Sequence, residues 1–197
     1  MDFLSMNTLG YPILSILVFL PLAGAVIVPL LPGENSVRVW TLLVTLANAV
    51  ISLPLFTRFN PTSALYQFAE HHPWIASFNV NYTLGVDGIS LLLVMMTTFI
   101  MPLCVLGSWK YIQKRVKEFM ICLLVMETSM LGVFMALDLV LFYVLWEAML
   151  IPMYLLIAVW GGPRKSYASI KFFLYTLAGS VFLLVAIVAL YINQGTF

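Results

Sequence analysis

The fold class follows from residues 139–160, LVLFYVLWEAMLIPMYLLIAVW, an apolar run that is long enough to cross a bilayer as one helix. This run carries a carboxylate, Glu147. An acidic residue at the centre of a membrane helix costs about 2.5 to 3.5 kcal/mol, whereas one hydrogen bond between membrane helices contributes only about 0.6 kcal/mol. Because one structural hydrogen bond does not offset that cost, Glu147 is expected to take up and release a proton. The alternative is a protonated acid that only binds a neighbouring helix.

Two tyrosines share the helix face of Glu147. Tyr143 lies four residues before it and Tyr154 lies seven residues after it, so the three side chains are expected to form one polar seam. Such a seam should face protein or water rather than lipid. Pro152 has no N–H and removes the helical partner of the Ala148 carbonyl, which predicts a kink beside the acid and a carbonyl that can hold water.

The composition of the chain excludes most soluble proteins. Its 197 residues are 63% hydrophobic and 9% charged, which is typical of a polytopic membrane protein. A formal net charge of +1 with no long basic run does not favour nucleic-acid binding. Cys104 and Cys122 lie inside apolar stretches without metal-ligand spacing, so we expect packed thiols rather than a disulfide or a metal site. His71 and His72 are adjacent and point apart on a regular backbone, so they are expected at the surface.

Further apolar segments bring the predicted number of membrane spans to about six, which makes the chain an all-α polytopic membrane protein. Residues 58–87 are too polar to cross and form the longest segment outside the membrane. Within them, apolar and polar residues alternate over 78–84, which predicts a short strand or one half of a β-hairpin. The six predicted spans cover residues 12–31, 39–56, 87–109, 119–137, 139–160 and 168–192.

Basic residues gather in two of the predicted loops. The linker 110–118, KYIQKRVKE, holds four of the nine Lys and Arg residues, and the loop 161–166 adds two more. The predicted spans place both loops on one side, which is cytoplasmic by the positive-inside rule. The N-terminus, the long polar loop, the turn at Asp138 and the C-terminus are then external. The residues before the first span carry Asp2 and no Lys or Arg, which predicts a retained helix rather than a cleaved signal.

Several spacings predict contacts between helices. The fourth span carries Thr128, Gly132 and Ala136 at four-residue spacing, a small-residue stripe that lets a neighbouring helix approach closely. Asp87 is placed to cap the first amides of the third span. The second span carries polar residues on one face, where they can bond to other helices: Thr41, Thr45, Asn48 and Ser52.

Two further ionisable residues fall inside predicted spans. Glu127 and Glu147 lie roughly 16 and 13 Å from the turn at Asp138, so the two acids occupy similar depths. Glu127 is either a second proton site or a structural, protonated group; periodicity does not show whether it faces Glu147, which would favour proton loading. Lys171 lies about one turn into the sixth span, where its long side chain can reach the interface; a proton relay is the weaker interpretation.

These residues resemble a known family. The strings ALDLVLFYVLWEAMLIPMYLLI at 136–157, WGGPRKSYASIKFFLYTLAGS at 160–180 and LGVDGISL at 84–91, with Glu127-Thr128, are similar to those of the antiporter-like proton-channel subunits of respiratory complex I. This family includes subunit M of the bacterial NADH-quinone oxidoreductase and subunit 4 of mitochondrial NADH dehydrogenase. The WEAMLIPMYLLI string is quite specific within the wider superfamily, and the similarity runs essentially along the whole chain.

The resemblance implies a membrane subunit of a redox-driven proton pump, with the family's essential glutamate of the fifth helix falling on Glu147. The sequence contains no NADH, flavin, iron–sulfur or haem motif, so no cofactor is expected in this chain. NADH, FMN, iron–sulfur clusters and quinone are expected in other subunits. The expected partners are other membrane subunits of the complex, the lipid bilayer and protons. The expected location is a bacterial inner membrane rather than a mitochondrial one.

The resemblance also divides the chain. Residues 1–118 correspond to an N-terminal three-helix region, and residues 119–197 to the first three helices of an antiporter-like repeat. Lysines that the family uses in later helices have no counterpart here, so we expect a truncated product, a split gene product or part of a longer chain that does not pump alone. Two other functions stay open: a subunit of a cation/proton antiporter or membrane-bound hydrogenase, and a non-conducting assembly or scaffold fragment.

Overall fold

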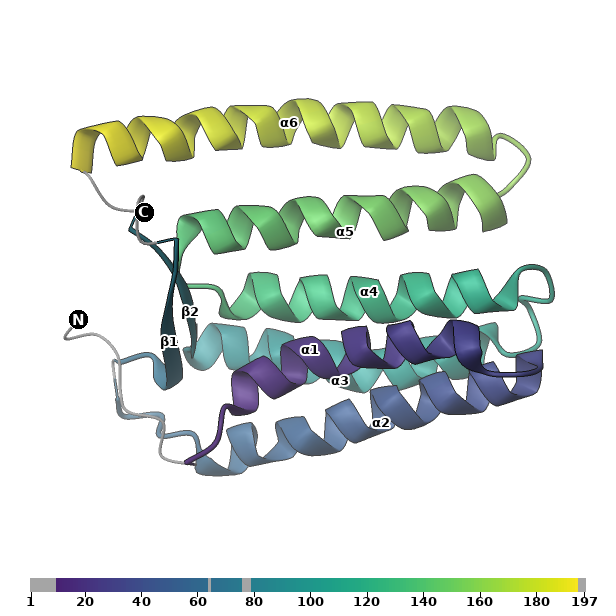
Figure 1. Ribbon diagram of the computed structural model, residues 1–197, viewed down its shortest axis with the longest axis horizontal. Coiled ribbons are helices and arrows are strands. Elements are labelled where there is room, and N and C mark those ends of the chain that lie inside the picture. Colours follow the sequence, from purple (N-terminus) through teal and green to yellow (C-terminus); the bar gives the residue numbers. More distant parts are fainter. Residues whose placement is uncertain (1–9, 64, 76–78, 195–197) are drawn as a thin grey trace.

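The computed structural model describes residues 10–63, 65–75 and 79–194, which form long helices and a β-hairpin (Figure 1). Within these described ranges, six helices are long and apolar enough to cross a membrane, which confirms the predicted class. The hairpin pairs two antiparallel strands, β1 (Gln67–Ile75) and β2 (Val80–Val86). The helices are α1 (Ile13–Ile27) with the 3₁₀ turn η1 (Val28–Leu30), α2 (Glu34–Arg58), α3 (Gly88–Ser108), α4 (Val116–Met135), α5 (Leu139–Trp160) and α6 (Lys165–Gln194).

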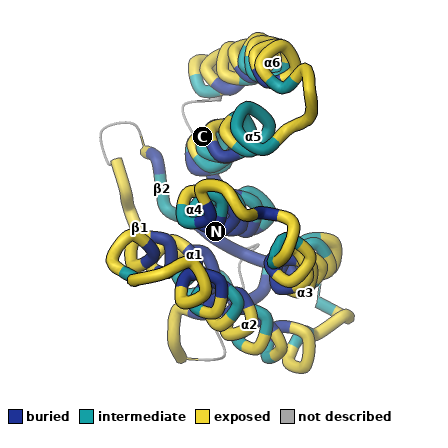
Figure 2. The backbone as a smooth tube through the Cα atoms, turned by 90° about the vertical axis from the view of Figure 1, so that its right-hand side faces the viewer, coloured by how far each residue is buried: buried dark blue, intermediate teal, exposed yellow. Residues whose placement is uncertain are grey.

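The helix α4 lies at the centre of the arrangement. It packs against α1, α2 and α3 on one side and against α5 on the other, while α6 packs against α5 at the outside (Figure 2). The helices α1 to α4 enclose two buried apolar clusters, one near the hairpin and one toward the opposite end. Most residues of α6 are exposed. The molecule therefore consists of an enclosed four-helix part and a more open pair of helices.

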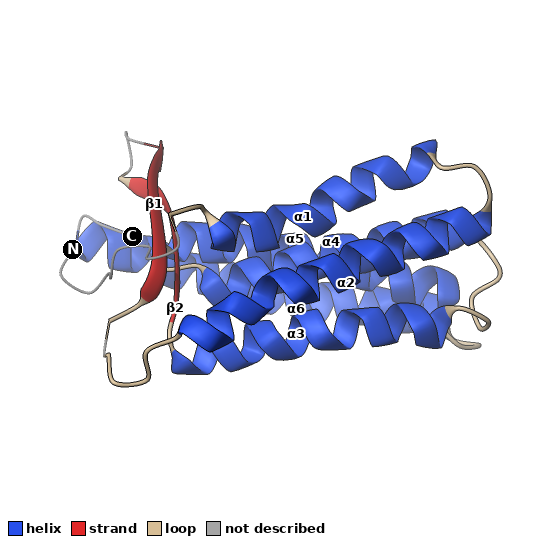
Figure 3. Cartoon of the chain, turned by 90° about the horizontal axis from the view of Figure 1, so that it is seen from below, coloured by secondary structure: helices blue, strands red, loops and turns tan. Residues whose placement is uncertain are grey.

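The hairpin crosses one end of the bundle and binds the helices that begin there (Figure 3). The buried carboxylate of Glu70 in β1 accepts hydrogen bonds from the amides of Leu14 (2.8 Å) and Ser15 (3.1 Å), and from the Ser15 hydroxyl. Glu70 thereby caps α1 in place of the N-cap residue Pro12, which makes no side-chain cap hydrogen bond. The hydroxyls of Ser15 and Tyr82 lie 2.9 Å apart, and burial raises the pKa of Tyr82.

Two aspartates start helices at the same end. Asp87 accepts a hydrogen bond from the Ser90 amide (2.7 Å), which confirms the predicted cap of α3 and is the main cause of a lowered pKa for Asp87. Asp138 is buried and accepts from the Val140 amide (2.9 Å) at the start of α5. Its other oxygen accepts from the Asn81 amide of β2 (2.8 Å), so one side chain ties α5 to the hairpin.

The loops at 110–118 and 161–166 hold the basic residues predicted to share one side, and Figure 1 shows both loops at the end of the bundle opposite the hairpin. The Arg38 guanidinium donates to the Ile112 carbonyl (2.8 Å), which joins the start of α2 to the loop before α4. The Trp160 indole donates to the Lys114 carbonyl (2.8 Å), which joins the end of α5 to the same loop. Hydrogen bonds from two helices therefore hold this basic loop in place.

The structure also departs from the predicted elements. The helix α2 begins at Glu34 rather than near residue 39, because polar residues at a span end reach water without leaving the helix. The strand β2 confirms the prediction over residues 80–84; Phe78 lies outside the described residues, as do the two chain ends that were predicted to be external. The strand β1 was missed, because its sequence QFAEHHPWI lacks regular alternation and its pairing is irregular at Pro73.

The predicted polar face of α2 is fully buried. Its four side chains turn inward, and Ser52 lies 3.0 Å from the Thr98 hydroxyl of α3. The predicted small-residue stripe of α4 is used at Gly132, because a Cβ there would lie 2.6 Å from Leu145 of α5. Both patterns therefore mark helix contacts. The buried residues of the α2 face, all 0% exposed, are Thr41, Thr45, Asn48 and Ser52.

Candidate functional site

Glu147 occupies the middle of α5. Its side chain is half-buried, and its Oε1 atom is buried without a hydrogen-bond partner among the residues that the structure describes. The Tyr143 hydroxyl, one helical turn earlier, interacts with the Glu147 carboxylate and with the Ser180 hydroxyl of α6. Glu147 therefore lies beside a polar contact between α5 and α6, and it keeps one oxygen that can bind a proton.

The rest of the predicted seam also meets α6. The centroids of the Tyr154 and Phe173 rings lie 5.5 Å apart in an edge-on arrangement. Pro152 is buried, and α5 continues as a helix through it. Because proline has no N–H, the Ala148 carbonyl next to Glu147 lacks its usual helical partner. A hydroxyl, a carbonyl and a carboxylate thus lie within two turns, a set of groups that can hold water inside a bundle.

Glu127 has a different environment on α4. Its side chain is 0% exposed, and its Oε1 atom accepts a hydrogen bond from Asn48 Nδ2 of α2 (2.8 Å). Its Oε2 atom and Asn48 Oδ1 have no partner among the residues that the structure describes. Glu127 therefore faces the enclosed four-helix part of the molecule.

The two acids lie on opposite sides of the contact between α4 and α5. Leu145 of α5 packs on Gly132 of α4, and Leu141 belongs to a buried cluster with Met135 of α4. Glu147 is two residues after Leu145, or roughly 200° around the helix, so it points away from α4. Glu127 points to α2. Two like-charged acids would favour proton loading only if their carboxyl groups faced each other. Glu127 and Glu147 do not face each other.

Lys171 lies on the open side of α6. Its side chain is exposed, and its Nζ atom lies 5.7 Å from the centroid of the Tyr167 ring. With Arg164 and Tyr175 it lines a depression on this helix of about 570 Å³. Within the described part of the chain, no hydrogen bond or ion pair joins Lys171 to either acid.

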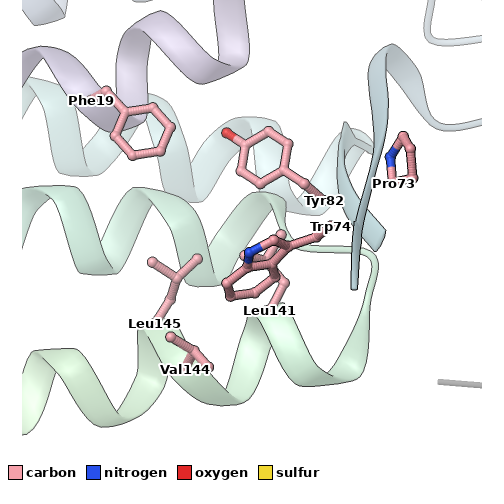
Figure 4. Close-up of a pocket in the computed structure, with 7 residues that line it drawn as sticks. All are labelled: Phe19, Pro73, Trp74, Tyr82, Leu141, Val144 and Leu145. Atoms are coloured by element: carbon pink, nitrogen blue, oxygen red, sulfur yellow. The ribbon is translucent and has the colours of Figure 1, made fainter. Parts of the chain in front are cut away.

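An apolar pocket of about 480 Å³ lies between α1, α5 and the hairpin (Figure 4). Figure 4 shows Phe19, Tyr82 and Trp74 on its walls, with Leu141 and Leu145 of α5. Neither acid lines it, so it is separate from the proposed proton groups. The residues that the structure describes contain no group of three or more His, Cys, Asp or Glu side chains that could hold a metal ion.

Sequence reasoning named both acids and placed Tyr143 beside Glu147, but it missed Asn48 as the partner of Glu127 and Ser180 as the partner of Tyr143. It placed Asn48 on the buried face of α2, but the periodicity of one helix does not tell which residue of another helix it meets. It likewise missed Glu70, whose capping role joins residues far apart in the sequence. The capping role of Asp138 could have been found, because an Asp directly before an apolar helical run is the same signal that identified Asp87.

The fold and the site define a polytopic membrane protein whose described residues include six candidate spans, with an ionisable acid inside the fifth. Residues 13–136 match the family described as NADH-ubiquinone oxidoreductase chain 4, amino terminus, and residues 136–197 match the NADH:quinone oxidoreductase/Mrp antiporter transmembrane family. The chain belongs to the NADH-ubiquinone oxidoreductase chain 4 family, which confirms the resemblance found in its sequence.

Curated relatives agree with this assignment. NADH-quinone oxidoreductase subunit M of Rhodobacter capsulatus is 48% identical over 190 residues, which cover 93% of this chain and 36% of that protein. NADH-ubiquinone oxidoreductase chain 4 of Marchantia polymorpha is 40% identical over 192 residues, which cover 94% of this chain and 38% of that protein. The chain thus spans less than half of the length of these relatives.

Solved structures contain the same arrangement of helices. A chain of respiratory complex I from Thermus thermophilus with bound NADH superposes with a TM-score of 0.80 at 29% identity, covering 92% of this chain and 36% of that one. A chain of the Mrp complex from Dietzia sp. DQ12-45-1b gives a TM-score of 0.78 at 21% identity, covering 93% of this chain and 20% of that one. At such low identity the second similarity shows the fold alone.

Proposed function

We propose that the chain is a membrane subunit of a proton-pumping NADH:quinone oxidoreductase and that Glu147 is a proton-transfer group on part of its transmembrane path. The observation that carries this proposal is an acid in the middle of an apolar span, with one buried oxygen that has no hydrogen-bond partner in the described part of the chain. Membrane spans retain such acids mainly on ion or proton paths. The family and the named relatives supply the electron-transfer context.

The polar groups around Glu147 define how it would act. Protonation of its Oε1 atom neutralises the acid, and release of the proton restores a charge beside the Tyr143 hydroxyl. The hydroxyls of Tyr143 and Ser180 can accept and donate, so they can pass a proton between α5 and α6. The Ala148 carbonyl can hold a water molecule beside the acid. Lys171, on the exposed face of α6, is a weaker contributor to the same path.

The proposal assigns the electron chemistry to other subunits. NADH, FMN, iron–sulfur clusters and quinone would be bound there, while this chain supplies protonatable side chains. Its partners are the other membrane subunits of the complex, and its location is a bacterial inner membrane, in keeping with the bacterial relatives. A mitochondrial inner membrane is the alternative location, in keeping with the plant and algal relatives.

The deciding experiment replaces Glu147 by glutamine in the assembled complex. Glu147→Gln keeps size and polarity but cannot release a proton, so NADH-driven proton pumping should be lost while the complex still assembles. Glu118→Gln is the matched control, because Glu118 is exposed near the start of α4 and pairs with Arg115 (3.2 Å). Intact pumping in assembled Glu147→Gln would favour the scaffold function. Absence of NADH-dependent quinone reduction in membranes containing the complex would favour the antiporter or hydrogenase function.

A further inference from the structure

The contact between α2 and α4 contains two buried acceptor atoms that lack a donor. Asn48 Nδ2 donates to Glu127 Oε1 over 2.8 Å. The other oxygen of each side chain, Glu127 Oε2 and Asn48 Oδ1, is buried and unpartnered among the described residues. Both residues are 0% exposed, so bulk water does not reach them. Unpartnered buried polar atoms are rare in folded proteins, and two at a single contact call for a common explanation.

Charge limits the explanations. An ionised Glu127 would need a nearby cation, and the ranges of α1 and α3 contain no charged residue. The cations nearest along α2 and α4 are Arg38, Arg58 and Lys117, each ten residues from the contact, or about 15 Å along its helix. Glu147 on α5 points away and carries the same sign. A negative charge on Glu127 would therefore lie unpaired inside a membrane span, which is unfavourable.

We propose that Glu127 holds a proton on Oε2 and donates it to Asn48 Oδ1, so that acid and amide form a ring of two hydrogen bonds between α4 and α2. One proton gives both unpartnered atoms a partner and removes the charge. The hydrogen-bonded pair is then uncharged, links α4 to α2 and keeps its proton during turnover. Proton transfer uses other groups. This inference concerns a different acid from Glu147 and does not depend on the function proposed for it.

The direct test is infrared spectroscopy of the assembled complex with Glu127→Gln. Glutamine matches the protonated acid, because its amide donates to Asn48 Oδ1 and its carbonyl accepts from Asn48 Nδ2. The variant should assemble and pump within about twofold of the unsubstituted complex. Its spectrum should lose one carbonyl band of a protonated carboxyl group, and in the unsubstituted complex that band should not change during NADH turnover. Glu118→Gln is the control and should leave the band in place.

A second measurement tests whether the two side chains act as a pair. Asn48→Leu leaves the acid without its partner and should lower the thermal stability of the complex. Adding Glu127→Leu should recover much of that loss, because replacing both partners of a buried hydrogen bond by apolar groups can be nearly neutral. If the losses of thermal stability from Asn48→Leu and Glu127→Leu simply add in the double variant, the proposed pairing is overturned. If Asn48→Leu fails to assemble, the infrared band still decides.

Three results of the infrared and pumping measurements would overturn the proposal. The first is that no protonated-carboxyl band disappears in Glu127→Gln, which would mean an ionised acid. The second is a band that shifts during turnover, which would mean that Glu127 exchanges its proton. The third is loss of pumping by an assembled Glu127→Gln complex. A failed prediction for Glu147 would leave all three measurements unaffected, so the two proposals fail separately.

Discussion

The helices α4 and α5 each carry one acid inside an apolar span, and their surroundings differ. Glu127 is fully buried on α4, which packs against α1, α2 and α3, and it has an amide partner on α2. Glu147 of α5 lies on the far side of the contact between α4 and α5, half-buried, beside hydroxyl groups that can exchange protons. Two acids at similar sequence-predicted depth therefore have different access to partners and to water.

Under the two proposals, an acid in a membrane span is not by itself a proton-transfer group. A proton carrier needs a route for protons to arrive and leave, and hydroxyl and carbonyl groups near Glu147 offer one. The full burial of Glu127 and its amide partner favour a fixed protonation state. Variants that change one environment and leave the other intact test this contrast, because the two acids should respond independently.

The largest effect is expected from Glu147→Ala. It removes the carboxyl group that would carry the proton, so NADH-driven pumping should be abolished while assembly is largely preserved. Glu147→Asp keeps a carboxyl group on a shorter side chain and should retain partial activity. Pumping is measured as acidification in sealed vesicles, and assembly by native gel electrophoresis. Loss of the assembled complex in Glu147→Ala would give Glu147 a structural role and remove the contrast with Glu127.

The sequence predicted the spans well because the apolar length needed to cross a bilayer leaves few alternatives. The limits of α5 were predicted as residues 139–160 and found there, since Asp138 and Gly161 end the apolar run abruptly. The side chains that face inward on α2 were also predicted, because helical periodicity fixes which residues share a face.

The partners of these side chains could not be predicted. Which helix each face meets depends on how the helices rotate and pack, so neither the bond from Asn48 to Glu127 nor the contact of Tyr143 with Ser180 could be read from one sequence. The strand β1 was missed for a related reason. Glu70 and its neighbours have a weak strand pattern and are held by contacts with α1 and β2.

A smaller but selective effect is expected from Gly132→Ala. The added Cβ would lie 2.6 Å from Leu145 Cδ1, so α5 must move away from α4 or Leu145 must shift. Overpacking of this kind costs about 1 to 3 kcal/mol of stability. We expect pumping to fall while the infrared band assigned to Glu127 stays unchanged, because Asn48 lies on the other side of α4. A changed band would mean that the two environments are coupled.

The control for this variant is Gly107→Ala in α3. A Cβ at Gly107 meets no atom within 4 Å, so nothing in the fold needs to move. Alanine is also the better helix former by about 1 kcal/mol. Thermal unfolding of the complex should therefore show no loss of stability. A loss equal to that of Gly132→Ala would contradict the packing argument.

Asp138→Ala should loosen the start of α5 without affecting the hydrogen bonds between Glu127 and Asn48. The change removes the acceptor for the amides of Val140 and Asn81, and loss of a capping side chain costs about 0.5 to 2 kcal/mol. Hydrogen exchange should accelerate at the first turn of α5 and in β2, while exchange around Glu127 stays slow. Asp138→Asn keeps one oxygen acceptor and should lose less. Equal increases in hydrogen exchange at the start of α5 and around Glu127 on α4 would contradict the view that the two environments are independent.

The smallest effect is expected from Tyr143→Phe. This change removes the hydroxyl that interacts with Glu147 and Ser180 but leaves the carboxyl group that would carry the proton. Loss of one such polar interaction should slow pumping by about twofold to tenfold. Tyr175→Phe is the matched control, because Tyr175 is 82% exposed on α6 and should have no effect. If Tyr143→Phe abolished pumping as completely as Glu147→Ala, the hydroxyl would be as necessary as the acid. The contrast between the two helices would then lie in the polar groups beside each acid rather than in the acids themselves.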